Sequence, residues 1–264
     1  MKKSGFLSKL YVFLVLAFMQ LPILILVVSS FNASSSRAVW EGFSLKWYSE
    51  LFRDPTVMNA LWVTLGCGFL AALISTIIGT LAAIGLNSMK KRAYSITLSI
   101  SYLPMMNAEI VTGVSLFLLY SMFNIQTGFV TLLISHITFC LPYVILSVMP
   151  KVRQFEYSRY EAAIDLGATP AYAIYKIMLP ELAPGIISGF ILSLTLSIDD
   201  FVISNFTTGG GVENLSMLIF SSKSSMGGTH QKINALSTIM YVVVLAILII
   251  NNIRNRKTDK DNLF

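Results

Sequence analysis

The sequence predicts an all-α membrane protein with six transmembrane helices and both termini on the cytoplasmic side. Its 264 residues are 55% hydrophobic and only 12% charged, whereas a soluble domain averages about 25% charged residues. The apolar residues form long continuous runs instead of the alternation of a membrane barrel. Basic residues gather in alternate loops between these runs, which gives the orientation.

Six apolar stretches are candidates for membrane spans. A spanning helix needs about 20 mainly apolar residues, and backbone groups in lipid must bond within the segment, which favours helices. The stretches are 10–30, 61–86, 96–122, 128–149, 182–203 and 235–250. The last is short, and we expect it to extend by a turn at one end. We expect the whole chain, 1–264, to form a single transmembrane domain.

The first span resembles a secretory signal because Lys2, Lys3 and Lys9 precede it. Its apolar run of about 20 residues exceeds the 7–15 of a signal sequence. No small-x-small cleavage site follows it cleanly. An uncleaved anchor is therefore expected.

The second span is rich in small residues, which allow helices to approach closely within a bundle or against a second membrane subunit. These residues are Gly66, Gly68, Ala71, Ala72, Gly79, Ala82, Ala83 and Gly85. Pro22, Pro104 and Pro142 lie within three other spans and are expected to kink them. A break at Pro104 would lie close to Glu109 and could help to open a cavity.

The orientation follows from the excess of Lys and Arg in cytoplasmic loops. Most of the 19 basic residues fall on one side of the predicted bundle. They are Lys2, Lys3, Lys9, Lys90, Lys91, Arg92, Lys151, Arg153, Arg159, Lys176, Arg254, Arg256, Lys257 and Lys260. The other side has Arg37, Lys46, Arg53, Lys223 and Lys232. The loop 151–181 is therefore predicted to be cytoplasmic.

Several functional classes find no support in the sequence. The net charge of +6 fits basic residues that meet anionic lipid headgroups, and no basic patch interleaved with aromatics suggests nucleic-acid binding. Cys67 and Cys140 fall inside apolar spans and are expected to be packing residues. No metal-ligand spacing and no phosphate-binding G-x-x-x-x-G-K-[ST] occurs, so ATP dependence would come from a partner.

The loop 151–181 carries the most specific pattern in the chain. Glu161, Ala162 and Ala163 begin a segment of good helix formers, and Gly167 interrupts it. Thr169 followed by proline is a typical helix start. Leu179 and Pro180 are predicted to end this second helix before span five. The loop is thus expected to be a short helix, a turn and a second short helix.

This loop resembles the cytoplasmic coupling loop of ABC importer permeases, the membrane subunits driven by a separate ATPase. Its E-A-A, three residues, G, nine residues, I-x-L-P pattern matches theirs at fixed spacing. The resemblance implies the type I importer permease fold and a loop that docks into a groove of the ATPase. It implies that the contact with the ATPase is made by Glu161, Ala162, Ala163 and Gly167. Leu179 and Pro180 would then set the path by which the chain leaves the loop for the fifth span. ATP and Mg²⁺ would then be bound by the partner, and this chain would hold no cofactor.

Three carboxylates lie inside the predicted spans: Glu109 in the third, and Asp199 and Asp200 in the fifth. Each costs about 2.5–3.5 kcal/mol at a helix centre. No Lys or Arg lies within a span to pair with them. They therefore indicate a pathway for a cation or a proton, the alternative being a neutral acid bonded to a neighbouring helix. Adjacent Asp199 and Asp200 would point about 100° apart on one helix, so that one of them faces the pathway.

Three further stretches resemble the permease subunits of bacterial spermidine/putrescine importers. They are Val28–Asn32 with the later Trp40–Tyr48, Ile134–Pro142, and Leu192–Asp200. The likeness covers nearly the whole chain, although position 109 is Glu where related chains are expected to have Asp. It implies a polyamine substrate and an inner-membrane complex with a homologous first permease, two ATPase copies and an extracytoplasmic polyamine-binding protein.

Other functions stay open. The coupling loop is equally compatible with import of ferric iron, thiamine or an opine, although the acids favour a cation. A proton-coupled transporter could use Glu109 and Asp199 as a relay, but no inverted repeat is visible. An intramembrane enzyme finds little support, because Ser135 and His136 are adjacent and do not share a helix face.

Overall fold

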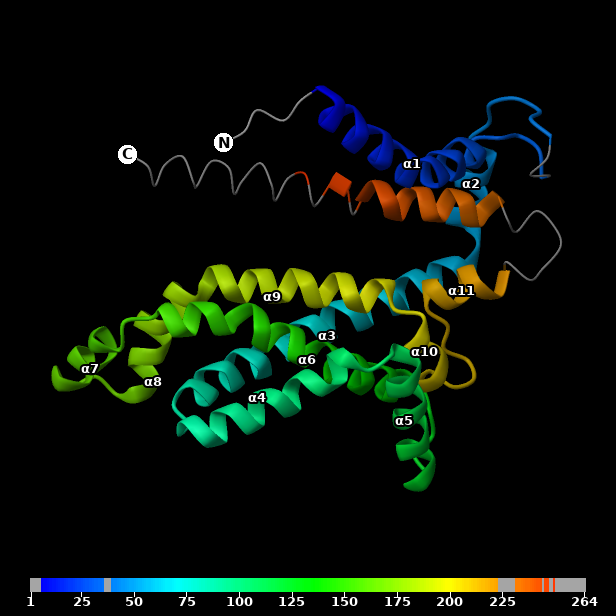
Figure 1. Cartoon of the computed structure of the whole chain (residues 1–264). Coiled ribbons are helices and arrows are strands. Elements are labelled where there is room, and N and C mark those ends of the chain that lie inside the picture. The colour runs from blue at the N-terminus through cyan, green and yellow to red at the C-terminus, as the bar shows by residue number, and fades with distance from the viewer. Residues whose placement is uncertain (1–5, 36–38, 223–230, 244, 247–248, 250–264) are drawn as a thin grey trace. The chain divides into compact units, whose positions relative to one another are not determined.

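The structure, a computed structural model, describes residues 6–35, 39–222, 231–243, 245–246 and 249 (Figure 1). Its named elements are the helices α1 (Phe6–Ser30), α2 (Lys46–Arg53), α3 (Pro55–Asn87), α4 (Lys91–Met106), α5 (Glu109–Met122), α6 (Phe129–Gln154), α7 (Tyr157–Asp165), α8 (Pro170–Ala173), the π-helical turn η1 (Ile174–Met178), α9 (Leu179–Asp199), α10 (Val202–Thr207) and α11 (Leu215–Ser222). Residues 231–243 are also helical.

Among the described residues, four helical stretches are long and apolar enough to cross a membrane: Leu10–Ser30, Pro55–Asn87, Phe129–Gln154 and Pro170–Asp199. The bent pair α4 and α5 makes a fifth if it is counted as one span. The predicted sixth span, 235–250, falls partly outside the described residues. So do Lys2, Lys3, Arg37, Lys223 and the basic tail from Arg254 to Lys260.

The chain forms two compact units. The first consists of Met1–Met58 and Ile219–Phe264 and includes α1, which exposes apolar side chains along most of its length, as a helix surrounded by lipid should. In this unit Trp47 is buried and donates from its indole nitrogen to the backbone oxygen of Asn32 (2.7 Å). Lys232 lies 3.5 Å from Asp54 and 3.7 Å from Glu50.

The second unit, Asn59–Leu218, is built on α3, α6 and α9 and contains the predicted site residues. Its main core includes Ala83, Val144, Val148 and Leu182 from these three helices. A Cβ atom at Gly79 would lie 2.7 Å from Cγ1 of Val144, so α3 and α6 approach too closely there for any larger residue. The small residues of the second span therefore do allow close helix contact, as predicted.

The third predicted span, 96–122, is not one straight helix. The helix is interrupted between α4 and α5, and the two helices are bent by 103° relative to each other. Pro104 lies two residues before the end of α4, where its missing N–H removes a helical hydrogen bond. The break places Glu109 at the first position of α5, not in the middle of a span.

The exit from the loop also differs from the prediction. Leu179 and Pro180 do not end a helix, since α8, η1 and α9 continue one another from Pro170 to Asp199. The π-helical turn Ile174–Met178 lies directly before Leu179 and Pro180 in this helical path. The predicted loop 151–181 is therefore shorter, because its first residues belong to α6 and its last to α9.

The fifth predicted span, 182–203, ends early. The helix α9 stops at Asp199, and Asp200 has extended backbone dihedrals (φ −66°, ψ 125°). The chain then turns into the short helix α10, which packs against α5 and α6. Asp199 is thus the last residue of α9 and Asp200 lies just outside it, so the two acids do not belong to one helix as predicted.

Candidate functional site

The first candidate region is the α7–α8 hairpin, residues 157–173, which lies beyond the ends of α6 and α9 (Figure 1). The helix α7 ends in a Schellman motif: the Gly167 N–H donates to the oxygen of Ile164 (2.8 Å) and the Ala168 N–H to that of Ala163 (3.0 Å). Gly167 has φ +89°, a conformation that favours glycine. A Cβ atom there would meet nothing within 4 Å, so the glycine is needed for the turn and not for packing.

The second helix of the hairpin starts where the sequence predicts. Thr169 is its N-cap, and its hydroxyl accepts from the Tyr172 N–H at 3.4 Å. Pro170 occupies the first helical position, where a missing N–H costs nothing. Local side-chain chemistry thus defines the whole turn from Gly167 to Pro170.

The predicted contact residues present a solvent-exposed surface on this hairpin. Glu161, Ala162 and Gly167 are exposed, and Ala163 is half-buried. Leu166, which the sequence reasoning missed, is 89% exposed, more than any other large hydrophobic side chain that the structure describes. The sequence did hold a signal for Leu166, because an apolar residue stands directly before the turn glycine of a charged loop. The Leu166 side chain is therefore open to contact with another protein.

An ion pair joins the hairpin to the start of α9. Arg159 on α7 contacts Glu181 in the first turn of α9 and lies 3.1 Å from Glu156. The hydrogen bond and charge of Glu181, with the charge of Glu156, raise the pKa of Arg159 above its ordinary value. Leu179 is half-buried and Pro180 exposed on the same helix, beside buried Met178.

The second candidate region contains the three predicted acids, which the structure separates by environment. Glu109 is exposed at the start of α5, and Asp199 is exposed at the end of α9. Asp200 is 7% exposed. Within the described part of the chain, no three His, Cys, Asp or Glu side chains come together in a group that could hold a metal ion.

Asp200 belongs to a buried polar group that we call the Asp200 cluster. Its members are His136, Ser197, Asp200, Ser204 and Asn214. One carboxylate oxygen of Asp200 accepts from the Ile203 N–H (3.2 Å), and the other accepts from the N–H (2.8 Å) and hydroxyl (2.9 Å) of Ser204. For Asp200 the structure agrees with the alternative of an acid hydrogen-bonded within the protein, because Ile203 and Ser204 on α10 supply the donors.

His136 is a packed, hydrogen-bonded residue. Its Nδ1 lies 2.6 Å from the Ser197 hydroxyl, and its Nε2 lies 3.0 Å from the Ser204 hydroxyl. Cys140, one turn further along α6, is buried and donates to the oxygen of Ser193 at 3.5 Å. Cys67 is also buried and free.

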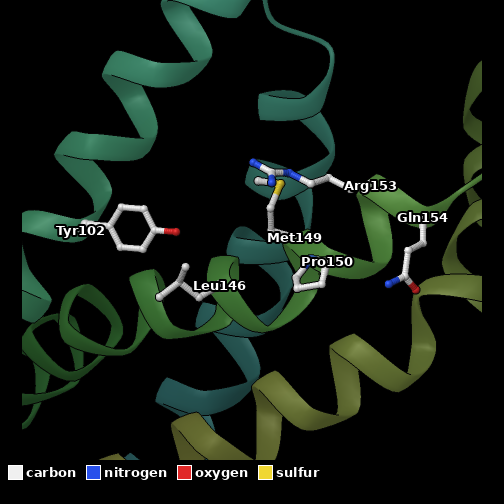
Figure 2. A pocket seen from close by; sticks show the side chains of 6 residues that line it. All are labelled: Tyr102, Leu146, Met149, Pro150, Arg153 and Gln154. Carbon is white, nitrogen blue, oxygen red and sulfur yellow. The ribbon is translucent and has the colours of Figure 1, made fainter.

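A cavity of about 340 Å³ lies between α4 and α6. It is lined by Tyr102, Leu146, Met149, Pro150, Arg153 and Gln154, and Figure 2 shows Tyr102 projecting from α4 toward the side chains of α6. The Arg153 guanidinium contacts the Tyr94 hydroxyl and lies over its ring (5.3 Å). None of the predicted site residues lines this cavity.

Comparison with known proteins places this architecture in one family. Residues 75–256 match the family of binding-protein-dependent transport system inner membrane components. The chain is 38% identical over 254 residues to the spermidine/putrescine transport system permease protein PotC of Haemophilus influenzae, covering 96% of this chain and 98% of that protein. It is also 38% identical over 235 residues to the putrescine transport system permease protein PotI of Escherichia coli, covering 84% and 81%.

Solved structures agree on the fold. A chain of a bacterial ABC transporter involved in the import of the acidic polysaccharide alginate superposes with a TM-score of 0.69 at 17% identity, covering 94% of this chain and 92% of that one. A chain of the MetNI methionine ABC transporter superposes with a TM-score of 0.57 at 18% identity, covering 78% and 94%. The chain has the helical fold of ABC importer permeases and belongs to the family of inner membrane components of binding-protein-dependent transport systems.

Proposed function

We propose that this chain is the transmembrane permease subunit of an ATP-driven polyamine importer, with spermidine and putrescine as substrates. It forms half of the translocation pathway, and a homologous first permease forms the other half. The observation that carries the substrate class is the presence of two exposed carboxylates, Glu109 and Asp199, at helix ends in the second unit. Relatives at 38% identity are named as spermidine/putrescine and putrescine permeases.

The proposed complex adds two copies of an ATP-binding subunit and an extracytoplasmic polyamine-binding protein. This chain contributes the type I importer permease fold with six spans and cytoplasmic termini, and holds no cofactor. ATP and Mg²⁺ are bound by the ATPase. The chain lies in the bacterial inner membrane, in agreement with its family of inner membrane components, and lipid surrounds its apolar helices.

The α7–α8 hairpin is the proposed contact with the ATPase. Glu161, Ala162, Ala163 and Gly167 form the surface of the contact, and Leu166 fills an apolar depression in the partner. Leu179 and Pro180 transmit the movement, since they lie in the continuous helical path from Pro170 to Asp199. A continuous helical connection of this kind can carry a displacement at the hairpin toward Asp199 at the far end of α9.

Glu109 and Asp199 are the proposed substrate contacts. No Lys or Arg among the described residues forms an ion pair with either carboxylate. Polyamine ammonium groups can supply the missing charge through charge-assisted hydrogen bonds. Asp200 belongs to the same pathway region, but its carboxylate is bound by protein groups.

The test is labelled spermidine uptake by proteoliposomes that contain the assembled complex. We expect Glu109→Gln and Asp199→Asn each to raise the KM for uptake by about tenfold or more, as expected for a lost charged hydrogen bond. Asp165→Asn removes an exposed carboxylate from the hairpin and should leave KM unchanged.

Three outcomes would overturn parts of the proposal. Unchanged kinetics in both acid variants would remove Glu109 and Asp199 from the pathway. Uptake of another cation, but not of spermidine or putrescine, would change the substrate class. Uptake abolished by a protonophore at constant ATP would favour a proton-coupled transporter.

A further inference from the structure

The Asp200 carboxylate is fully engaged by the protein. Its two oxygens accept three hydrogen bonds from Ile203 and Ser204, at 2.8–3.2 Å. Its side chain is only 2% exposed. A substrate ammonium would have to displace these donors to reach it, and buried donors that lose their acceptor are costly.

His136 joins this carboxylate to two other helices. It reaches from α6 to Ser197 on α9 and to Ser204 on α10, and its Nε2 lies 3.5 Å from Asp200. One arrangement of protons satisfies every group. Ser197 donates to Nδ1, the Nε2–H donates to Ser204, and the Ser204 hydroxyl donates to Asp200.

Asn214 closes the cluster from the other side. Its amide donates to the Ser204 hydroxyl (2.7 Å) and to the Asp200 backbone oxygen (3.3 Å). The next residue, Leu215, donates its N–H to the Thr64 hydroxyl on α3 (2.7 Å). The turn after α9 is therefore tied to α3, α6 and α10 at once.

Asp199 precedes this anchor directly and is exposed. The helix α10 has six residues, too short to hold its direction without tertiary contacts. The two aspartates are consecutive. The contacts that hold the backbone at Asp200 therefore also fix the direction in which Asp199 projects from the end of α9. The two adjacent acids thus have different environments and different tasks.

We propose that Asp200 is a positioning residue whose carboxylate, held against His136 and Ser204, anchors the α9–α10 turn so that Asp199 faces the cationic substrate. The inference rests on the proposed function, in which Asp199 contacts that substrate. It predicts that Asp200 acts through its acceptor oxygens, whereas Asp199 acts through its charge.

The anchoring is tested without transport, by hydrogen–deuterium exchange of the purified complex over residues 201–214. Asp200→Ala should speed exchange of the Ile203 and Ser204 amides by about tenfold or more, because these amides lose their acceptor. Asp200→Asn keeps one of the two acceptor oxygens, which can still accept from the Ser204 N–H, so exchange of that amide should rise less than in Asp200→Ala. Asp199→Asn should leave it unchanged.

The link to Asp199 is tested by spermidine uptake in a double-mutant cycle. Asp200→Ala should raise KM by about tenfold in the parent protein but by less than about twofold when Asp199→Asn is already present, because coupled residues are not additive. Asp200→Asn, which keeps one acceptor oxygen, should give a KM closer to the parent value than Asp200→Ala does. A direct substrate contact would instead make Asp200→Asn as harmful as Asp200→Ala.

The two measurements separate this inference from the proposed function. Unchanged exchange in Asp200→Ala overturns the anchor, whatever the substrate is. If the effects of Asp200→Ala and Asp199→Asn on KM are fully additive, the inference that Asp200 acts through Asp199 is overturned. A parent complex that takes up no polyamine overturns the proposed substrate, and the exchange measurement still decides the anchor.

Discussion

The α7–α8 hairpin and the Asp200 cluster are stabilised over very different distances along the chain. In the hairpin the hydrogen bonds of Gly167 and Ala168 reach back only to Ile164 and Ala163. In the cluster His136 bonds to Ser197 and Ser204, 61 and 68 residues away. The hairpin presents its side chains to solvent, whereas the cluster buries them. Changes in the hairpin should therefore affect partners, and changes in the cluster should affect the protein itself.

The largest effect is expected from Gly167→Arg. A large residue at φ +89° strains the turn and adds a bulky side chain to the proposed ATPase contact. Stimulated ATP hydrolysis and uptake should fall by about a hundredfold, a loss of about 3 kcal/mol in coupling, while the protein still inserts. Gly167→Asn tolerates this conformation better and is the control. Normal uptake in Gly167→Arg would disprove the docking assignment.

Leu166→Asp should be the next most harmful. It places a charge where we propose that an apolar side chain enters the partner. ATP hydrolysis by the assembled complex should fall about tenfold, since burying an unpaired charge costs well over 1 kcal/mol. Leu166→Met keeps the apolar contact and should behave normally. The melting temperature of the purified chain should be the same in both, because Leu166 is exposed; a lower value in Leu166→Asp would mean that the residue packs internally.

In the cluster region, Gly209→Ala should destabilise the chain itself. A Cβ atom there would lie 2.3 Å from the Thr127 hydroxyl, at φ +68°. Gly211→Ala is a matched control, with φ +94° and nothing within 4 Å. Both variants have the strain of about 1–2 kcal/mol of a left-handed conformation, and only the first adds the clash. Thermal unfolding in detergent should therefore show a lower melting temperature for Gly209→Ala. Equal melting temperatures would contradict the close approach.

Ser204→Ala should have a moderate effect on stability. It removes the hydroxyl shared by His136, Asp200 and Asn214, and buried groups left unsatisfied cost about 1–3 kcal/mol. Ser115→Ala removes an exposed hydroxyl that bonds only to its own helix, at Val111, and should be nearly neutral. Thermal unfolding of the two variants compares them. A neutral Ser204→Ala would show that the cluster contributes little.

Arg159→Gln should have the smallest effect. The ion pairs to Glu156 and Glu181 are exposed, and exposed pairs contribute little and are screened by salt. We expect an unchanged melting temperature and a small, salt-sensitive fall in ATP hydrolysis. A large loss that persists at high salt would mean that Arg159 contacts the ATPase directly.

The same contrast explains what the sequence could predict. Thr169, Pro170 and Gly167 act on their immediate neighbours, so capping rules foretold the start of α8 and the turn before it. The spans 10–30 and 61–86 are recognisable because hydropathy is local, and α1 and α3 contain them. The continuous helix through Pro180 was missed, since a π-helical turn has no comparable local signature.

The helix boundaries near the three acids were predicted wrongly because they depend on tertiary contacts. The 103° break before Glu109 follows a proline whose effect on helix direction depends on what packs beside it. The end of α9 at Asp199 depends on Asp200, which finds donors in α10 and a neighbour in His136. Apolar runs continue across both places, so hydropathy alone indicated unbroken spans, although Pro104 was expected to kink the third of them.

The most direct test of a polyamine importer coupled through the α7–α8 hairpin is ATP hydrolysis by the reconstituted four-component complex, with and without spermidine-loaded binding protein. We predict that the loaded binding protein stimulates hydrolysis and that Gly167→Arg abolishes the stimulation. A complex that assembles but shows no stimulation by either spermidine or putrescine would contradict a polyamine importer. Stimulation that survives Gly167→Arg would contradict coupling through the hairpin.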